Sequence, residues 1–300
     1  MNILSSDDLS REAISRIFEI ADAMKGGQPV GTVKQRSVLA LYFEKPSTRT
    51  RLSFEVAIAQ LGGYAIYIDP ATTQRSRGEA LSDTFRIISS YCDFISCRLY
   101  KHSDLIEIAK SSSVPVINAL TDLEHPTQAL ADVYTMREMK KKSLKGVKIA
   151  FVGDIATNTT NSLMITAAKM GINMSLIGPK ECVPNAQYLA KARQYTKITV
   201  TDSPEEGLDG VDFVYTDTFV SMGEEAEAAR RKKLFAGYQV NAKMLGFAKR
   251  DALVMHCLPA HRGEEISADI LDGPRCIAWG QAANKLLLNK AILIYLSQQK

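Results

Sequence analysis

The fold is decided by the stretch Val38-Leu39-Ala40-Leu41-Tyr42-Phe43-Glu44-Lys45-Pro46-Ser47-Thr48-Arg49-Thr50-Arg51. Its first six residues form a continuous apolar run, which is typical of a buried strand. Pro46 ends this strand, because proline has no N–H to donate to a sheet. Apolar side chains then recur at helical spacing as far as Gly62-Gly63, so the stretch predicts a strand that leads directly into a helix.

The same alternation of strand and helix extends over both halves of the chain. In the first half, a helix is expected after Ser10, and strands are expected at residues 65–68, 94–97 and 114–117. In the second half, helices are expected at 162–170 and 282–297, and strands at 147–152, 174–177, 198–201, 213–215, 253–256 and 276–278. This order predicts an α/β protein with two Rossmann-like domains, each a parallel sheet flanked by helices, and an active site in the cleft between them.

The length of 300 residues also favours two domains, because a single hydrophobic core stops growing near this size. We expect the boundary at the basic stretch 140–146, which we interpret as a solvated helix end followed by a linker. A phosphate or nucleic-acid patch is the alternative there. The predicted domains are residues 1–142 and 143–283, and a last helix at about 284–300 is expected to pack back on the first domain.

Composition restricts the classes of function. A formal net charge of +4 suits a small anionic substrate and gives no support to a nucleic-acid or membrane partner. No apolar run approaches the roughly 18 residues that a membrane-spanning helix needs, and the acidic start lacks the blocks of a secretion signal. Five scattered cysteines indicate reduced thiols rather than disulfides or a metal site. We therefore expect a cytoplasmic protein with no metal.

The start of the helix after the first strand is the strongest candidate for an anion site. Backbone N–H groups are free at a helix N-terminus, and the helix dipole favours negative charge there. Hydroxyl and guanidinium donors fill this first turn: Ser47, Thr48, Arg49, Thr50 and Arg51. A Ser47 N-cap with solvated arginines is the alternative, but the dipole disfavours two cations at this end. The pattern favours a phosphate site.

Two further segments follow predicted strands of the first half. His125-Pro126-Thr127-Gln128 opens a helix, and His125 suits either a structural role or an oxyanion donor. Arg98 ends an apolar strand, where it either reaches solvent or lines a site at the carboxyl edge of the sheet.

The second half offers three more segments. Cys257, within Met255-His256-Cys257-Leu258-Pro259-Ala260-His261-Arg262-Gly263-Glu264-Glu265, suits a nucleophile, a zinc ligand or a small buried residue, and further zinc ligands are missing nearby. Asp217 suits an ammonium partner or a helix cap. Gly153-Asp154 lies where a dinucleotide fingerprint would start, but its remaining glycines are absent, which disfavours a nicotinamide cofactor.

Together these motifs resemble the aspartate/ornithine carbamoyltransferase family over the whole chain and in the expected order. Residues 47–51 and 125–128 look like the family's two carbamoyl-phosphate motifs, and residues 256–265, with Asp217 and Ser221-Met222-Gly223, resemble its ornithine branch. The resemblance implies carbamoyl phosphate and L-ornithine as substrates, in a reaction that requires no cofactor. It also implies trimers, or multiples of trimers, with active sites between subunits.

The resemblance further implies which residues form the site. Carbamoyl phosphate would contact Ser47, Thr48, Arg49, Thr50, Gln74, Arg98, His125, Pro126, Thr127, Gln128, Cys257, Leu258 and Lys285. L-Ornithine would contact Asn158, Asp217, Ser221 and Met222. The catalytic groups would be Cys257, Arg49, Arg98 and His125, while Gln74 would come from a neighbouring subunit.

The sequence departs from the family pattern at two places. The usual Gln-x-Glu-Asn-Arg is Gln281-Ala282-Ala283-Asn284-Lys285 here, and Lys285 keeps the charge of the arginine but loses its bidentate fork. Thr157 stands where a second asparagine is common. A putrescine carbamoyltransferase and a non-catalytic carbamoyl-phosphate-binding relative remain alternatives. A nicotinamide-dependent dehydrogenase is the alternative suggested by the fold, and an aspartate acceptor fits residues 256–265 less well.

Overall fold

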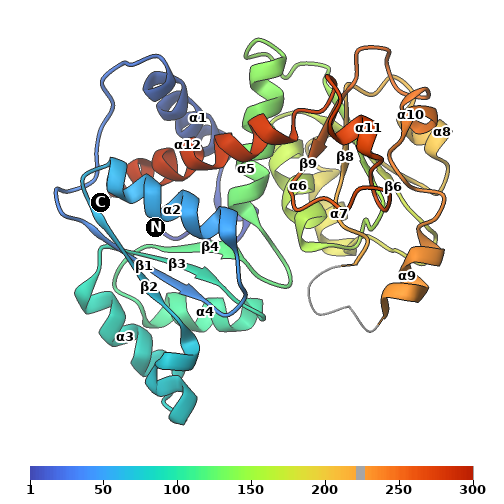
Figure 1. The fold of residues 1–300 in the computed structure, drawn as a ribbon. Helices are drawn as coiled ribbons and strands as arrows, with labels where there is room; N and C mark the ends of the chain where they lie inside the picture. Colours follow the sequence, from blue (N-terminus) through green and yellow to red (C-terminus); the bar gives the residue numbers. More distant parts are fainter. Residues whose placement is uncertain (221–226, 300) are drawn as a thin grey trace. The chain divides into compact units, whose positions relative to one another are not determined.

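Figure 1 shows the fold in a computed structural model, which describes residues 1–220 and 227–299. The chain divides into two units. Unit 1 comprises Met1–Ala131 and Ala283–Lys300, and unit 2 comprises Asp132–Ala282. The division falls inside helix α5 (Pro126–Met139) rather than at the expected residues 142/143. A continuous helix crosses the junction there, so no change in composition marks it.

Unit 1 contains a four-stranded parallel sheet in the order β2-β1-β3-β4. Its elements are α1 (Arg11–Lys25), β1 (Val38–Phe43), α2 (Thr48–Gln60), β2 (Tyr64–Ile68), α3 (Leu81–Tyr91), β3 (Phe94–Arg98), α4 (His102–Ser111), β4 (Val116–Leu120) and the first turns of α5. β1 has the predicted bounds. β4 begins at Val116 rather than at the predicted residue 114, because Pro115 has no N–H to donate to the ladder.

The last helix, α12 (Ala278–Ser297), contributes most of its length to unit 1. Asn289 Nδ2 donates to Ser53 Oγ on α2 at 2.9 Å, and Lys290 Nζ donates to Gln60 Oε1 at 2.9 Å. The helix begins before residue 282, where the sequence placed its start. These contacts tie the end of the chain to the helix that follows β1.

Unit 2 contains a five-stranded parallel sheet in the order β7-β6-β5-β8-β9. Its elements are β5 (Lys148–Val152), α6 (Asn158–Lys169), β6 (Asn173–Ile177), α7 (Ala186–Ala192), β7 (Ile198–Thr201), α8 (Pro204–Leu208), β8 (Phe213–Thr216), α9 (Ala228–Leu234), α10 (Ala242–Leu245), β9 (Leu253–His256) and α11 (Ala268–Leu271). The two parallel sheets with flanking helices confirm the predicted α/β fold class.

The strand predicted at residues 276–278 is wrong. Cys276 forms only an isolated parallel bridge with Val254, and helix α12 starts at Ala278. A short apolar run does not distinguish a strand from the start of a buried helix. Here the run forms a single bridge, and the helix begins two residues later.

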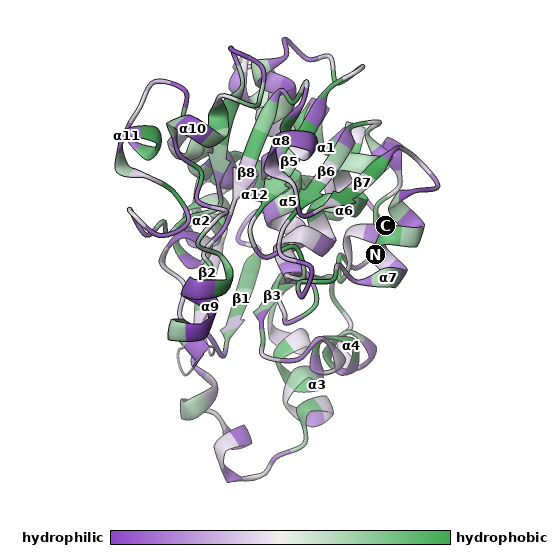
Figure 2. Ribbon diagram, turned by 90° about the vertical axis from the view of Figure 1, so that its right-hand side faces the viewer, coloured by the Kyte–Doolittle hydropathy of each residue, from purple (hydrophilic) through white to green (hydrophobic). Residues whose placement is uncertain are grey.

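The strands form the cores of the two units. Figure 2 shows that β1, β5 and β8 are largely hydrophobic, and the side chains of β8 are all buried. Both faces of a parallel sheet are covered, so its strands are apolar without alternation. This explains why the continuous apolar runs identified these strands in the sequence.

The basic stretch 140–146 has a structural partner in unit 2. Lys140 Nζ lies 2.7 Å from Asp212 Oδ1, and Lys249 Nζ lies 2.8 Å from the same atom. Burial alone would raise the pKa of Asp212, but hydrogen bonds from these two lysines lower it below its ordinary value. The ion pair favours the interpretation of this stretch as a helix end over a phosphate patch.

The order of the strands reverses at a corresponding position in each sheet. In unit 1 the chain runs from β1 to β2 on one side and then to β3 on the other. In unit 2 it runs from β5 through β6 to β7 on one side and then to β8 on the other. Ligands of open α/β sheets bind beyond the carboxyl ends of the strands at such a reversal. In unit 1 these are the ends of β1 and β3, and in unit 2 the ends of β5 and β8.

Candidate active site

Ser47 determines how α2 begins. Its backbone is extended, at φ −159° and ψ 111°, and its Oγ accepts from the Thr50 N–H at 3.3 Å. Ser47 is therefore the N-cap of the helix, and its hydroxyl proton can still be donated to another group. The first turn of α2 carries further backbone N–H groups that the helix itself cannot satisfy. Since this turn follows β1, these donors lie at the carboxyl edge of the sheet.

The two arginines of this turn differ in their surroundings. Arg51 Nε lies 2.8 Å from Glu55 Oε1, and its guanidinium lies 3.5 Å from the centre of the Tyr67 ring. The pair with Glu55, four residues on, explains Arg51 without a ligand. Arg49 makes no hydrogen bond or ion pair with the described residues. Of the two cations that suggested a phosphate site, only Arg49 is left for an anion.

Lys285 joins the two predicted carbamoyl-phosphate motifs of unit 1. Its Nζ donates to Gln128 Oε1 at 2.8 Å and to Thr50 Oγ1 at 3.1 Å. All three side chains are buried. A buried ammonium group is costly unless the surrounding groups stabilise it. The positive charge at this position therefore lies between the start of α2 and the start of α5.

His125 is held as a neutral imidazole in the same region. Burial lowers its pKa well below the ordinary value, and the positive charges of Lys285 and Arg98 lower it further. Thr127 Oγ1 lies 3.4 Å from its Nδ1. Arg98 is buried at the end of β3, which pairs with β1 up to Phe43. A neutral histidine beside two cations can donate one hydrogen bond without adding a third charge.

Glu124 supports the loop before α5, and it was not among the predicted site residues. The carboxylate is fully buried and accepts from Ser6 N at 2.7 Å and Ser5 Oγ at 2.5 Å. Ser5 and Asp8 form a capping box for the first short helix, which orients these donors. The Ser-x-x-Asp spacing was the only signal in the sequence, and it gave no indication of the distant glutamate.

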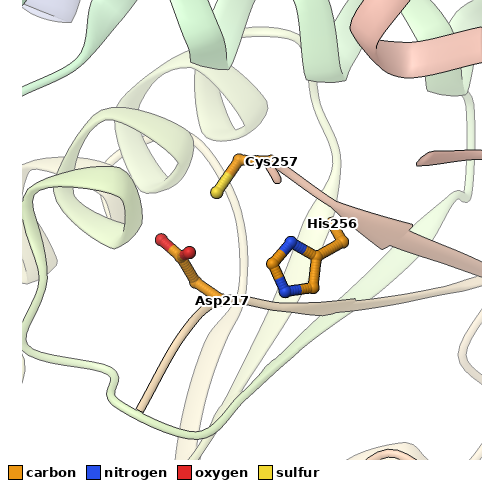
Figure 3. Close-up of side chains that lie close together, drawn as sticks. All are labelled: Asp217, His256 and Cys257. Atoms are coloured by element: carbon orange, nitrogen blue, oxygen red, sulfur yellow. The ribbon is translucent and has the colours of Figure 1, made fainter. Parts of the chain in front are cut away.

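In unit 2, Asp217 and Cys257 come together at the ends of β8 and β9. One ligand-type atom each of Asp217, Cys257 and His256 lies within 4.8 Å of the others. Figure 3 shows the Cys257 thiol pointing toward the Asp217 carboxylate. The parallel pairing of Thr216 with His256 produces this proximity, because the next residue of each strand leaves the sheet at the same edge.

His256 does not have the free nitrogen that a metal ligand needs. Its Nδ1 accepts from the Leu258 N–H at 2.8 Å, so the ring proton is on Nε2, which lies 3.1 Å from Glu265 Oε1. Both ring nitrogens are therefore engaged. Asp217 and Cys257 alone are too few for a zinc site, which takes at least three protein ligands.

A buried chain of hydrogen bonds fixes the end of β9. Tyr215 OH donates to Asp132 Oδ2 at 3.0 Å, and Gln281 Nε2 donates to Asp132 Oδ1 at 2.6 Å. Gln281 Oε1 then accepts from the His256 N–H at 3.0 Å. Burial, followed by the Asp132 charge, raises the pKa of Tyr215 well above its ordinary value. The chain fixes the backbone next to Cys257, and none of its members was predicted as a site residue.

Comparison with known proteins identifies the family. A family model described as the carbamoyl-phosphate-binding domain of aspartate/ornithine carbamoyltransferases matches residues 1–138, and one for the Asp/Orn-binding domain matches residues 145–296. The chain belongs to the aspartate/ornithine carbamoyltransferase family. The residues between the two matched ranges, 139–144, overlap the basic stretch 140–146.

Several relatives within this family resemble the chain over nearly its whole length. The ornithine carbamoyltransferases of Hyperthermus butylicus and Bacillus subtilis are each 44% identical over 97% of this chain, and the matches cover 96% and 92% of those proteins. The ornithine carbamoyltransferase structure from Pyrococcus furiosus has a TM-score of 0.92 at 42% identity, covering 98% of this chain and 96% of that one. The anabolic enzyme from Campylobacter jejuni has a TM-score of 0.93 at 38% identity and full coverage of both chains.

The predicted carbamoyltransferase site residues divide between the two units. Unit 1 holds Ser47, Thr48, Arg49, Thr50, Gln74, Arg98, His125, Pro126, Thr127, Gln128 and Lys285, and unit 2 holds Asn158, Asp217, Cys257 and Leu258. Cys257 and Leu258 are thus in a different unit from the other residues predicted to contact carbamoyl phosphate. Ser221 and Met222 lie outside the described residues. Gln74 is exposed on the 3-10 turn Gln74–Arg77.

Asn158 and Leu258 occupy turns at the edge of the unit 2 sheet. Asn158 is the first residue of α6 and Thr157 is its N-cap, so the threonine that departs from the family pattern caps the helix. Leu258 has a φ of +57°, a conformation that is strained for a residue with a branched side chain. Its N–H is held by His256, which maintains this turn after Cys257.

A separate cavity of about 700 Å³ lies in unit 2. Its lining includes the apolar side chains of Phe219, Phe235 and Met244 together with Lys232 and Glu264. None of the predicted site residues that the structure describes lines it. Cavity size alone therefore does not locate the chemistry in this unit. Among the described helices, none combines the length and apolarity needed to cross a bilayer.

Proposed function

We propose that the protein transfers the carbamoyl group of carbamoyl phosphate to the δ-amine of L-ornithine, giving L-citrulline and phosphate. The observation that carries this proposal is the position of Lys285, which bonds to Thr50 and Gln128 from the two motifs assigned to carbamoyl phosphate. A lysine thus supplies positive charge where the family usually has an arginine. The ornithine carbamoyltransferase relatives support the choice of acceptor.

The first step is the binding of the phosphate group in unit 1. The free N–H groups of the first turn of α2, the Ser47 and Thr48 hydroxyls and the Arg49 guanidinium would surround the phosphate oxygens. Lys285 would add a point charge, while Arg49 would supply the bidentate contact that lysine cannot make. This set neutralises the negative charge that increases on the phosphate as it leaves.

The second requirement is polarisation of the carbamoyl carbonyl. Arg98 and a neutral His125 would donate hydrogen bonds to the carbonyl oxygen, with Thr50 as a third donor. Donors fixed in advance where charge develops contribute roughly 3 kcal/mol each to the stability of a transition state. Because His125 is neutral, it donates a hydrogen bond without transferring a proton to the oxygen.

The third requirement is a neutral amine. An alkylamine has a pKa near 10.4, so about one molecule in a thousand or fewer is neutral at pH 7. Cys257 and Asp217 would orient the amine and take up its proton, and Asp217 would also pair with the α-ammonium group. The nitrogen lone pair then forms a bond to the carbonyl carbon, which gives a tetrahedral intermediate. The carbon–oxygen bond to phosphate breaks, phosphate leaves with the electron pair, and the remaining extra proton of the nitrogen passes to the departing phosphate.

We also propose a homotrimer or a multiple of trimers in the cytoplasm, acting in arginine biosynthesis. β2 is an edge strand of its sheet, and Tyr64 and Ile66 on it are more than half exposed, as is Leu52 on α2. A second copy would cover this apolar edge and bring an exposed Gln74 to its neighbour's site. None of the five cysteines, all within the described residues, forms a disulfide, which supports a reducing compartment.

One experiment tests the acceptor. The purified protein is mixed with carbamoyl phosphate and either L-ornithine, putrescine or L-aspartate, and the carbamoylated product is measured. We expect citrulline from ornithine, with inhibition by norvaline, which has the α-amino acid group but no δ-amine. Faster turnover with putrescine than with ornithine, without inhibition by norvaline, would show that putrescine is the acceptor. Binding of carbamoyl phosphate without turnover of any acceptor would indicate a non-catalytic relative.

A further inference from the structure

Arg231 on α9 connects three segments of unit 2. Its guanidinium donates to Asp154 Oδ2 through Nη2 and to the Phe219 carbonyl through Nε at 2.5 Å. The same guanidinium lies 5.3 Å from the centre of the Phe235 ring. The Arg231 and Asp154 side chains are only 13% and 10% exposed, so this is a mostly buried ion pair.

The first of these segments is the turn after β5. Gly153 has a φ of +117°, and a Cβ there would lie 3.0 Å from the ring of Phe219. Asp154 uses its second oxygen to accept from the Ala156 N–H at 3.0 Å. Arg231 therefore holds a turn that leads within four residues to Asn158, one of the predicted ornithine contacts.

The second segment is the loop after β8. Phe219 lies two residues beyond Asp217, is buried, and stacks on Phe235 with ring centres 4.8 Å apart. Arg231 donates a hydrogen bond to the carbonyl oxygen of this same residue. The position of the Asp217 loop relative to the β5 turn is therefore set by Arg231 and by the close approach of the Phe219 ring to Gly153, which leaves little room for a Cβ there.

We infer that Arg231 is a positioning residue for the amino-acid substrate, because it holds the turn that leads to Asn158 and the loop of Asp217 at a fixed spacing. This inference rests on the proposed function. The residue acts through Asp154 and Phe219. Only arginine can bond to a carboxylate and a carbonyl from one planar group, since the single ammonium of lysine has no fork. Loss of Arg231 leaves the buried Asp154 charge without this partner, so the spacing is expected to relax.

A purely structural role would have different consequences. It would lower the thermal midpoint of the protein and leave both Michaelis constants unchanged. A positioning role should affect ornithine far more than carbamoyl phosphate, because all the predicted carbamoyl-phosphate contacts except Cys257 and Leu258 lie in unit 1, whereas Arg231 lies in unit 2. Arg230, the neighbouring residue, is exposed and pairs only with the exposed Glu227 among the described residues, which makes it a matched control.

The test compares the full-length protein with Arg231→Gln, Arg231→Lys, Asp154→Asn and Arg230→Gln. Initial rates of citrulline formation give kcat and a KM for each substrate, and thermal unfolding is followed in parallel. We expect Arg231→Gln and Asp154→Asn each to raise the KM for ornithine at least tenfold, with the KM for carbamoyl phosphate changed less than twofold. Arg231→Lys should recover part of the ornithine affinity, and Arg230→Gln should match the unaltered protein.

The double variant adds a second criterion. Since Arg231 and Asp154 act through one contact, Arg231→Gln combined with Asp154→Asn should raise the KM for ornithine little beyond either change alone. An unchanged ornithine KM in the single variants, or equal rises for both substrates, would overturn the inference. If Arg231→Gln fails to fold, Asp154→Asn and Arg231→Lys decide by the same criteria. An unaltered protein that makes no citrulline would instead refute the proposed function itself.

Discussion

Nζ of Lys285 lies 2.8 Å from Oε1 of Gln128, a residue 157 positions earlier in the chain. The contact joins helix α12 to the start of α5, and the same nitrogen reaches Thr50 on α2. Three segments that carry predicted carbamoyl-phosphate residues thus share one buried cation. In the sequence, Lys285 stands out only as a departure from a family arginine.

Replacing Lys285 with methionine should weaken carbamoyl-phosphate binding and leave ornithine binding intact. Hydrogen bonds to charged groups contribute about 1.5–3 kcal/mol, so the KM for carbamoyl phosphate should rise about ten- to a hundredfold. Methionine removes the cost of burying an ammonium group but also takes a donor from the buried Gln128 Oε1, so the stability of the unliganded protein should change little. Measurement of both KM values and of the shift in melting temperature with carbamoyl phosphate checks this prediction.

Lys290→Met is the matched control, because Lys290 lies on the same helix and bonds to Gln60 at the surface. It should retain both the KM values and the ligand-induced shift. A Lys285→Met protein with an unchanged shift would remove Lys285 from the site.

Arg49 and Arg51 should differ strongly, although they are two residues apart. Arg49→Ala should lower kcat/KM for carbamoyl phosphate by about a hundredfold to a thousandfold, because it removes a donor to the leaving phosphate. Arg51→Ala should cost at most a few-fold, since Arg51 already pairs with Glu55 and packs on Tyr67. Steady-state kinetics of the two variants test this difference. An equal fall in kcat/KM for both would contradict the separate roles assigned to Arg49 and Arg51.

The elements that could be predicted from the sequence are those with a clear local pattern, namely the apolar strands and the longer helices. The inner strands β1, β3, β5 and β8 were apparent as apolar runs because they are buried on both faces, whereas the edge strand β2 is partly exposed. The helices α7, α8, α9, α10 and α11 were not predicted, since four to seven residues are too few to show a helical period. The Glu55 partner of Arg51 has the i,i+4 spacing of helical ion pairs and could have been anticipated from the sequence.

The supporting contacts of the site could not have been predicted in the same way. Gln281 and Asp132 are 149 positions apart, and Arg231 and Asp154 are 77 apart. Neither pair lies within one element, so no periodicity or cap connects its members in the sequence. The motif residues were found because they cluster after strands, while the residues that orient them are positioned only by the folded sheet.

Cys257→Ser should lower kcat far more than it changes the KM for carbamoyl phosphate. The thiol lies beside Asp217 in unit 2, so its loss should affect handling of the amine rather than binding of the phosphate. Cys276→Ser, a half-buried cysteine of the same unit, provides the control. Parallel falls in kcat and carbamoyl-phosphate affinity, or no fall in either, would reject the proposed role of the thiol.

The neutral state of His125 predicts a pH dependence of stability. Its pKa in the folded protein lies well below the value of about 6.5 expected in the unfolded chain. Below pH 6.5 the unfolded state therefore binds a proton that the folded state excludes. This histidine should reduce stability by up to about 1.4 kcal/mol per pH unit as the pH falls toward the folded pKa.

The corresponding measurement is denaturant unfolding of the unaltered protein and His125→Gln between pH 7.5 and 5.5. The unaltered protein should lose stability more steeply over this range, with both proteins showing the same dependence above pH 7. If the free energy of unfolding had the same pH dependence in both proteins over the whole range, His125 would accept the proton in the folded protein.

The most direct measurement follows the carbamoyl carbon itself. Carbamoyl phosphate labelled with ¹³C is mixed with L-ornithine and the protein, and the ¹³C and ³¹P resonances are recorded together over time. The label should move into the ureido carbon of citrulline as an equal amount of inorganic phosphate appears, and Arg49→Ala should suppress both signals. Phosphate that accumulates without labelled citrulline, or label that persists unchanged in carbamoyl phosphate, would contradict a transfer between these two substrates.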